Sequence, residues 1–266
     1  MTPYSTENGT DLMASSVIPG KTSVVLNPAP REQSKRTYVI FGTERGGTSM
    51  VAGVARALGL PLGEIEEGNN EDKSFHNKSL GRMRATVDQR NAEMDVWGWK
   101  YPTAVTYLPV LSRTIRNPYF IIVYRDTVAT ALSRLQWDGE FIRRAPRMSL
   151  HETSSMASAN TSFALATGRP CLLVSNEKGQ VDSSSLIDEL ADFLCVTRPE
   201  DDMRNRILEY IEPGRYKKFD EYFRPSGIKG LAPLLPVPAM APGAANSTNT
   251  ENAELSTSSI REESDQ

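Results

Sequence analysis

Short runs of consecutive apolar residues, separated by segments with helical spacing, most constrain how this chain can fold. Such runs are typical of strands buried on both faces, as in a parallel sheet. The runs are TYVIFG (residues 37–42), YFIIVYR (119–125) and CLLVSN (171–176), with VWGWK (96–100) as a weaker fourth candidate. Helices are expected between them, over residues 49–58, 76–94, 128–137 and 186–193. Strands that alternate with helices pair in parallel through right-handed crossovers, so we predict an α/β domain of three layers with a central, mainly parallel sheet.

Two details support the expected helices. Gly59 follows the first of them as its stop signal. In the third, Val128, Leu132 and Leu135 recur at i, i+4 and i+7. This spacing places the three side chains on one face of that helix.

Both ends of the chain differ in composition from this central part. Residues 1–36 are rich in Ser, Thr, Asn and Pro without periodic apolar spacing, and from about residue 227 the chain becomes Pro/Ala-rich and then Ser/Thr/Asn/Glu-rich. Such segments bury too little apolar surface to offset the entropy of ordering them. We therefore expect disordered segments over residues 1–36 and 227–266, and one folded domain over residues 37–226.

Charge and composition restrict the classes of function. The net charge is −3, and the hydrophobic content of 39% and charged content of 24% are ordinary for a globular protein. A weakly acidic chain does not suit a nucleic-acid binder that works by bulk electrostatics. The sequence shows no secretory signal pattern and no apolar run of membrane-spanning length. We expect a soluble, cytoplasmic protein with no nucleic-acid partner and no membrane span.

The two cysteines, Cys171 and Cys195, each lie inside an apolar run. They show neither metal-ligand spacing nor a disulfide pattern. We interpret them as buried free thiols in a reducing compartment.

The stretch FGTERGGTSMVAG, residues 41–53, joins the first expected strand to the first expected helix. A turn of this kind presents backbone N–H groups at the positive end of a helix dipole and favours an anion. Gly46 and Gly47 allow close approach of the backbone, and the hydroxyls of Thr48 and Ser49 add donors. Because ligands of open α/β sheets bind beyond the carboxyl ends of the strands, we predict an anion site here, with an ordinary turn as the alternative.

The loop nearly matches GxxxxGK[ST], the signature of P-loop nucleotide-hydrolysing proteins. Gly42 and Gly47 have the right spacing, but Thr48 stands at the lysine position. That lysine reaches the β- and γ-phosphates. Its loss argues against ATP hydrolysis on this P-loop-type domain, and Arg45 is the cation that the loop itself offers.

These residues resemble the 5′-phosphosulfate loop of the sulfotransferases that use 3′-phosphoadenosine-5′-phosphosulfate (PAPS). The family's loop reads approximately R/K-S-G-T-S/T. The corresponding residues here are Arg45, Gly46, Gly47, Thr48 and Ser49, with Gly46 in place of the usual serine. The resemblance implies that PAPS is the co-substrate. It also implies that Arg45 contacts the phosphosulfate bridge and steadies the charge on the leaving phosphate.

The stretch IIVYRDTVATALSRL, residues 121–135, is similar to the family's 3′-phosphate motif. That motif is a strand ending in Arg, followed by a helix with Ser eight residues on, and Arg125 and Ser133 have this spacing. An arginine at a strand end can fork onto phosphate oxygens, and a serine two turns into the next helix can reach the same group. The alternatives are a salt bridge of Arg125 with Asp126 and an ordinary exposed Ser133.

A third likeness is WGWKYP, residues 97–102, where many family members have WGWKDP. The resemblance implies that Lys100 lies at a strand end and neutralises the transferring sulfuryl group. Tyr101 replaces the frequent Asp, which weakens any role of that position as a base. The alternative is a solvated lysine beside two core tryptophans.

Transfer to a hydroxyl requires a general base, and the chain has only two histidines. In many family members an acidic residue or histidine that faces the acceptor lies where NNEDKSFHNKSL stands here. We choose His76 as the candidate base, with Glu71 and Asp72 as rivals. His151 precedes a Ser/Thr-rich stretch that we expect to be a helix, and we interpret His151 as structural or exposed.

The stretch FIRRAPR, residues 141–147, carries Arg143, Arg144 and Arg147. These arginines could touch the nucleotide or an anionic acceptor. A charge run is usually a solvated face, and we prefer that interpretation.

The resemblance extends over residues 37–225. It implies in-line transfer of a sulfuryl group from PAPS to a hydroxyl or amine of a small molecule, a lipid or a carbohydrate such as a glycan. No metal is expected, because fixed cations can suffice for a sulfuryl group. Two alternatives stay open: an ATP-dependent small-molecule kinase on a P-loop scaffold, and a non-catalytic nucleotide-binding protein. The acceptor itself is not readable, because function resides in the site rather than the scaffold.

Overall fold

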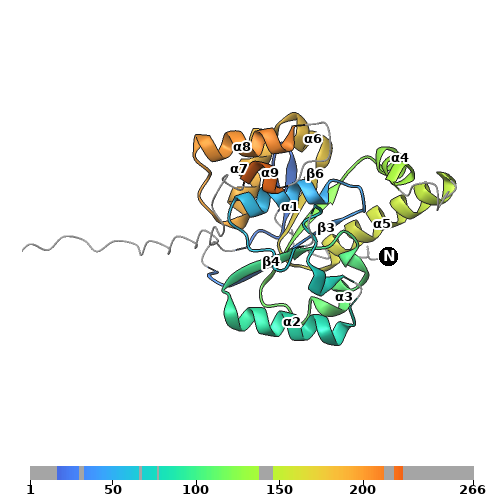
Figure 1. Ribbon diagram of the computed structural model, residues 1–266. Coiled ribbons are helices and arrows are strands. Elements are labelled where there is room, and N and C mark those ends of the chain that lie inside the picture. The colour runs from blue at the N-terminus through green and yellow to red at the C-terminus, as the bar shows by residue number, and fades with distance from the viewer. Residues whose placement is uncertain are drawn as a thin grey trace, which may run out of the picture. The chain divides into compact units, whose positions relative to one another are not determined.

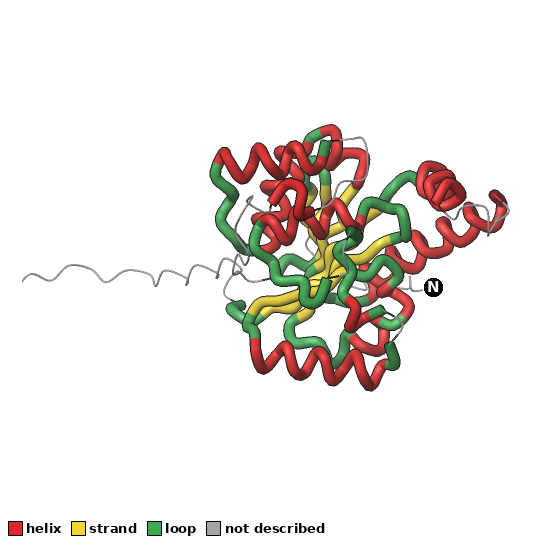
Figure 2. Tube along the Cα trace, viewed as in Figure 1, coloured by secondary structure: helices red, strands yellow, loops and turns green. Residues whose placement is uncertain are grey.

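The computed structural model describes residues 17–29, 33–65, 68–76, 78–137, 146–212 and 219–223. Their strands form one six-stranded sheet in the order β1-β2-β6-β5-β3-β4. The strands are β1 (Val17–Pro19), β2 (Ser23–Leu26), β3 (Arg36–Gly42), β4 (Val96–Lys100), β5 (Pro118–Tyr124) and β6 (Cys171–Ser175). From β6 to β4 all neighbours pair in parallel, whereas β1 and β2 are antiparallel. Figure 1 shows the strands running through the centre of the fold, and Figure 2 colours them yellow.

Helices connect the strands. The α-helices are α1 (Thr48–Ala57), α2 (Leu80–Glu93), α3 (Leu108–Leu111), α4 (Thr127–Trp137), α5 (Pro146–Ala166), α6 (Asn176–Val181), α7 (Ser183–Leu194), α8 (Asp201–Ile211) and α9 (Phe219–Phe223). Two short 3₁₀ helices are η1 (Lys73–Phe75) and η2 (Ala104–Thr106). Within the described ranges, no helix combines the length and the apolar character that a membrane crossing requires.

The core lies on both faces of the sheet, because successive side chains of a strand point to opposite sides. Tyr38 and Ile40 of β3 pack in a cluster with α1, α7 and α8. Val39 and Phe41 pack on the other face with side chains of α2, α3 and α5. Figure 1 shows α1, α7 and α8 on one side of the sheet and α2 and α3 on the other. The prediction of a three-layer α/β domain with a mainly parallel sheet is therefore confirmed.

The start of the chain differs from the prediction. We expected all of residues 1–36 to be disordered, but Val17–Pro19 and Ser23–Leu26 are strands, and β2 pairs with β6. The local composition could not reveal this pairing, because the partners of residues 17–26 are far along the chain. These partners are the edge of β6 and a carboxylate of α7. The other expected disordered residues, 1–16 and 227–266, lie outside the described part.

Glu189 of α7 is that carboxylate. It accepts hydrogen bonds from the backbone N–H of Lys21 at 2.7 Å and from the hydroxyls of Thr22 at 2.7 Å and Ser23 at 2.6 Å. The turn between β1 and β2 is thereby fixed to α7. Burial raises the pKa of Glu189, but these hydrogen bonds outweigh it and hold the pKa below the usual 4.5.

The contacts of α4 also differ from the apolar pattern. Val128 and Leu132 share a face, as expected, but their side chains are 55% and 54% exposed. The buried face of α4 instead packs against α5: the Ser149 hydroxyl donates to the Ala131 carbonyl at 3.2 Å, and Arg134 pairs with Glu152. Because small and polar side chains make this interface, hydrophobic periodicity did not reveal it.

The two cysteines lie in different environments. Cys171 is buried in β6, and its burial raises the pKa of the thiol to about 12. Cys195 is exposed, so the expectation that both thiols are buried is wrong for it. It follows the last residue of α7 with a φ of 56°, which ends the helix and turns the residue away from the core.

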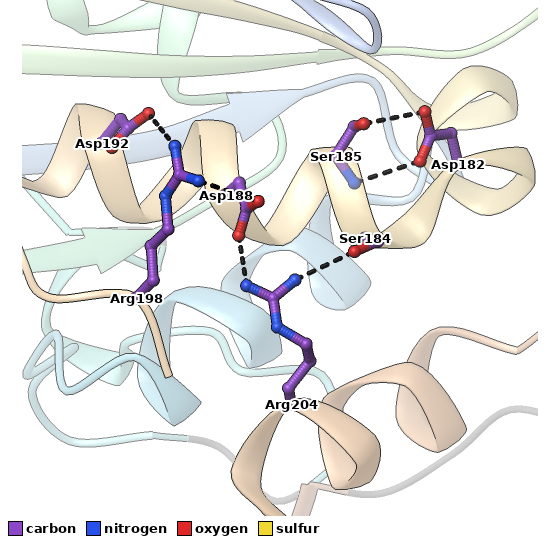
Figure 3. Close-up of polar contacts among 7 residues, drawn as sticks. All are labelled: Asp182, Ser184, Ser185, Asp188, Asp192, Arg198 and Arg204. Carbon is purple, nitrogen blue, oxygen red and sulfur yellow. Dashed lines mark hydrogen bonds and ion pairs between the residues drawn. The ribbon is translucent and has the colours of Figure 1, made fainter. Parts of the chain in front are cut away.

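A polar network fixes α8 against α7 (Figure 3). Asp188 of α7 pairs with Arg198 at 3.2 Å and also with Arg204 of α8. Arg204 donates a second bond to the Ser184 hydroxyl at 2.9 Å, and Arg198 pairs with Asp192 at 3.1 Å. The single negative charge of Asp188 is therefore shared by two arginines, and one of them, Arg204, lies on α8.

Candidate anion-binding site

The loop between β3 and α1 has the geometry of an anion site. The Gly46 N–H donates to the Thr43 carbonyl at 2.9 Å, and Arg45 and Gly47 both take left-handed conformations, with φ of 63° and 89°. Gly47 is the N-cap of α1. Its N–H and those of Thr48 and Ser49 have no acceptor among the residues that the structure describes. Unpaired donors at a helix N-terminus attract an anion.

Asn176, which we did not predict, lies against this loop. It begins α6 directly after β6, is 4% exposed, and its Oδ1 atom has no hydrogen-bond partner among the described residues. A Cβ atom on Gly47 would overlap Asn176 Oδ1. Only glycine therefore fits at position 47, for both its φ and its space. The position of Asn176 just beyond a strand end was the signal that could have revealed it.

Two predicted residues of the second motif lie beside this loop. Arg125 follows β5 and donates from Nη1 to the Arg45 carbonyl at 2.8 Å. Ser133 lies on α4, and its Oγ accepts from Arg45 Nε at 3.3 Å. Asp126 caps α4 instead, accepting from the Ala129 N–H at 2.7 Å. The structure thus brings Arg45, Arg125 and Ser133 together at the carboxyl edge of the sheet.

Lys100 is the last residue of β4 and is 1% exposed. Its ammonium donates to Ser49 Oγ at 3.2 Å, to the Asn69 carbonyl at 3.0 Å and to Glu71 Oε1 at 2.8 Å. Burial lowers the pKa of Lys100, and the Glu71 carboxylate opposes this effect. The lysine that the loop lacks is therefore replaced in space by one from the neighbouring strand, at the first turn of α1.

The three candidate bases have different environments. Asp72 is fully buried, pairs with Arg90 and accepts from the Ser74 N–H at 2.9 Å, so it has a structural role. Glu71 is paired with Lys100 inside the site. The ring of His76 is half-buried and lies 5.5 Å from the ring of Tyr101, the residue after Lys100.

The backbone of Ser49 is held from two sides. Its carbonyl accepts from Asn70 Nδ2 at 3.0 Å and from the Tyr210 hydroxyl of α8 at 3.2 Å. A Cβ on Gly53 would overlap the Tyr210 hydroxyl, so this glycine allows α8 to approach α1. Arg56 also donates to Asn70 Oδ1 at 2.6 Å. The first turn of α1 is therefore fixed both by the loop after α1 and by α8.

The remaining predicted positions lie away from these contacts or outside the described ranges. His151 and Arg147 are exposed on α5, as the solvated interpretation expects. Arg143 and Arg144 lie outside the described residues. In the part of the chain that the structure describes, no three His, Cys, Asp or Glu side chains are grouped as a metal site would require.

No family model matches the sequence, and no curated protein matches it. Several solved structures are similar to the chain, among them three sulfotransferases. Mouse sulfotransferase SULT7A1 complexed with PAP is 12% identical over 69% of this chain and 66% of its own, with a TM-score of 0.45. The sulfotransferase domain from the curacin biosynthetic pathway is 16% identical over 67% and 78%, with a TM-score of 0.43. The sulfotransferase domain from the Synechococcus PCC 7002 olefin synthase is 17% identical over 77% and 92%, also with a TM-score of 0.43.

Proposed function

We propose that this chain is a sulfotransferase that moves a sulfuryl group from PAPS to an acceptor hydroxyl or amine. The observation that carries the proposal is the convergence of Arg45, Arg125 and Ser133 beside the N-terminus of α1. These residues come from two motifs separated by about 80 positions, as the interval from Arg45 to Arg125 shows. The resemblance to PAPS-binding motifs implies that these residues share one site, and their contacts support the proposal.

The two anionic ends of PAPS have complementary partners in this site. The N–H groups of Gly47, Thr48 and Ser49 suit the 5′-phosphosulfate, because they lie at the positive end of α1 and no described residue accepts a hydrogen bond from them. The guanidinium of Arg125 and the hydroxyl of Ser133 suit the 3′-phosphate. Arg45 lies between the two ends, since its side chain contacts Ser133 and its backbone forms the loop.

Lys100 is assigned to the transferring group. Its ammonium donates a hydrogen bond to Ser49 Oγ in the first turn of α1, where the phosphosulfate would bind. The phosphosulfate of PAPS can take the place of the Glu71 carboxylate on this ammonium, because both are anions that compete for the positive charge of Lys100. A buried cation stabilises developing negative charge more strongly than an exposed one.

The reaction balances without a further reactant. An acceptor oxygen or nitrogen forms a bond to sulfur while the bond between sulfur and the bridging oxygen of the phosphosulfate breaks. The electron pair of that bond leaves with the phosphate of adenosine 3′,5′-bisphosphate, and the acceptor proton passes to a base. We assign the base to His76, with Glu71 as the alternative once Lys100 has exchanged partners.

The test is binding of adenosine 3′,5′-bisphosphate, measured by calorimetry beside adenosine 5′-monophosphate and ATP with magnesium. The bisphosphate should bind more tightly than either, and Arg125→Ala should weaken it by about 10- to 100-fold, the range for lost hydrogen bonds to a charged group. Arg113→Ala is the matched control, because Arg113 is an exposed arginine and its loss should leave the affinity unchanged. Tighter ATP binding with magnesium-dependent phosphate transfer would favour the kinase alternative. Nucleotide binding without turnover would favour a non-catalytic role.

A further inference from the structure

The carboxamide of Asn176 is a buried polar group without a partner in the fold. Asn176 directly follows β6 and is 4% exposed. Its Oδ1 atom is buried and accepts no hydrogen bond from any described residue. A buried polar atom that lacks a partner destabilises the folded state, so native proteins rarely keep one. The amide of Asn176 therefore needs an explanation other than stability.

This amide occupies the space where a side chain of Gly47 would lie. A Cβ atom on Gly47 would overlap Asn176 Oδ1 and lie 2.8 Å from Asn176 Cγ. Gly47 is the N-cap of α1, and its N–H has no acceptor among the described residues. The Asn176 amide is therefore in contact with the loop that we assign to the 5′-phosphosulfate.

The residues that follow β5 and β6 border this loop together. The two strands end in register, so Arg125 and Asn176 are the first residues beyond neighbouring strands. The next residues join the two ends, because Glu177 Oε1 accepts from the Asp126 N–H at 2.8 Å. Arg125 donates to the Arg45 carbonyl at 2.8 Å. The loop after β3 is therefore contacted from one side by a guanidinium and from the other by an uncharged amide.

An asparagine can serve an anion at this position, whereas a carboxylate would repel it. A half turn about the last side-chain bond exchanges the oxygen of the amide with its NH₂ group and keeps the shape of the side chain. Nδ2 of Asn176 then faces Gly47 at the N-terminus of α1, where the backbone N–H groups favour the same anion. Because the amide carries no charge, it does not compete with the donor for these N–H groups.

We propose that Asn176 is a binding residue for the donor, and that its Nδ2 atom donates a hydrogen bond to an oxygen of the 5′-phosphate. The inference rests on the proposed function, because this phosphate belongs to PAPS. The contact gives the amide beside Gly47 a partner that the described residues do not supply.

Two substitutions test this contact. Asn176→Ala removes the N–H donor and should weaken adenosine 3′,5′-bisphosphate by about tenfold, the effect of one hydrogen bond to a charged group. Asn176→Asp keeps nearly the same shape but places a carboxylate against the phosphate, and should weaken the bisphosphate by about 100-fold or more. Asn205→Asp is the matched control. Asn205 is exposed on α8, so the same change of charge there should leave the affinity unchanged.

The choice of ligand locates the contact at the 5′ end of the nucleotide. Calorimetry compares adenosine 3′,5′-bisphosphate, adenosine 5′-monophosphate and adenosine 3′-monophosphate. Both Asn176 variants should weaken the two ligands that carry a 5′-phosphate. They should bind adenosine 3′-monophosphate as tightly as the unmodified chain does.

Thermal melting separates this role from a structural one. Asn176→Ala should leave the melting temperature nearly unchanged, because removal of the unpaired oxygen offsets the loss of packing. A lowered melting temperature with an equal loss of affinity for all three ligands would show a structural role and overturn the inference. If circular dichroism shows that one variant is unfolded, the other decides, since each lacks the Nδ2 donor. If neither folds, Asn176 is structural and the inference is overturned.

The outcomes separate this inference from the proposed function. If the bisphosphate binds no more tightly than adenosine 5′-monophosphate, the two-ended donor fails, while a loss of the 5′-monophosphate alone in the Asn176 variants would still support the contact. If the bisphosphate binds tightly and Asn176→Ala binds it equally well, the proposed function stands and the inference is overturned. Failure of the unmodified chain to bind any of the three ligands would refute both.

Discussion

Arg45 donates from Nε to Ser133 Oγ at 3.3 Å, although 88 positions separate the two residues. Arg125 donates in turn to the Arg45 carbonyl, so one hydrogen bond joins the loop after β3 to α4 and another joins it to the loop after β5. The neighbouring strands β3 and β5 bring both loops to one edge. The residues that we assign to opposite ends of a nucleotide donor are therefore parts of one site.

Replacing Gly47 by Ala should damage this site directly. The residue has a φ of 89° and faces Asn176, so a Cβ there is strained and also clashes. Such strain costs about 2 kcal/mol, and we expect a lower melting temperature and at least a tenfold loss of affinity for adenosine 3′,5′-bisphosphate. Thermal melting and calorimetry measure the two effects.

Gly81→Ala is the control for this glycine prediction. Gly81 lies in α2, and a Cβ there would meet nothing within 4 Å. The change should keep or slightly raise stability, because alanine favours a helix by up to about 1 kcal/mol over glycine. Equal behaviour of the two variants would contradict the special role of position 47.

Glu189 should make the attachment of β1 and β2 depend on pH. Burial raises its pKa, but hydrogen bonds from Ser23, Thr22 and Lys21 lower it below 4.5, so the folded state holds the carboxylate more firmly than the unfolded state. The stabilisation is then complete above pH 4.5 and is lost as the pH falls through the lowered value. Glu189→Gln should cost about 2 kcal/mol at pH 7, the order of a charged hydrogen bond, and should flatten this acid dependence.

Chemical denaturation at pH 7 and at pH 3 to 4 measures this effect. Hydrogen exchange of the amides of β2 shows whether the loss is local to the first two strands. A Glu189→Gln protein that keeps the full acid dependence of the unmodified chain would refute the assignment to Glu189.

The elements that could be predicted from the sequence are those whose burial is apolar. β3, β4, β5 and β6 appeared within one residue of their observed bounds, because strands buried on both faces need continuous apolar runs. The helix α5 was located only as a Ser/Thr-rich helix after His151, because its buried positions Ser149, Thr153 and Asn160 are polar. Its apolar signal is therefore weak over all of its 21 residues.

The residues of the candidate site likewise differ in whether a local sequence pattern reveals them. The loop, Arg125, Ser133 and Lys100 could be located because each follows a strand at a spacing that has a physical reason. Asn176 could not, since its importance arises from what it approaches in space rather than from a local pattern. A single sequence does not reveal the contacts between segments that are distant along the chain.

Asp188→Asn should loosen α8 from α7. The carboxylate pairs with Arg198 and Arg204, and their side chains are 27%, 55% and 20% exposed, so only the Arg204 pair is largely shielded. We expect a loss of about 1 kcal/mol that shrinks at high salt, measured by urea denaturation. Because Tyr210 of α8 holds the Ser49 carbonyl, nucleotide affinity should also fall slightly.

The exposed pair of Asp202 and Arg206 provides the control for this network. It spans one turn of α8 at 2.9 Å, with exposed fractions of 83% and 44%. Asp202→Asn should change stability by less than about 0.5 kcal/mol, as pairs of this kind do. Equal losses for the two variants would mean that the network of α7 and α8 contributes no more than a surface pair.

Lys100→Met should separate function from stability. Burial lowers the pKa of Lys100, so the fold disfavours its charge despite the contact with Glu71. The loss of this charge offsets part of the cost of leaving the Glu71 carboxylate without a partner, and the Met variant should stay folded with a lowered melting temperature. The folded pKa lies below the usual 10.5, so the destabilising contribution of the charge is fully present below the folded pKa and disappears as the pH rises towards 10.5. In the Met variant this gain in stability on going to high pH should be absent.

Sulfuryl transfer from PAPS by the Lys100→Met variant should fall by about 100-fold or more, because the variant lacks the cation that we place at the developing charge. A variant that stays folded and transfers at the original rate would remove Lys100 from the mechanism, whereas one that unfolds would show that the ion pair with Glu71 is structural.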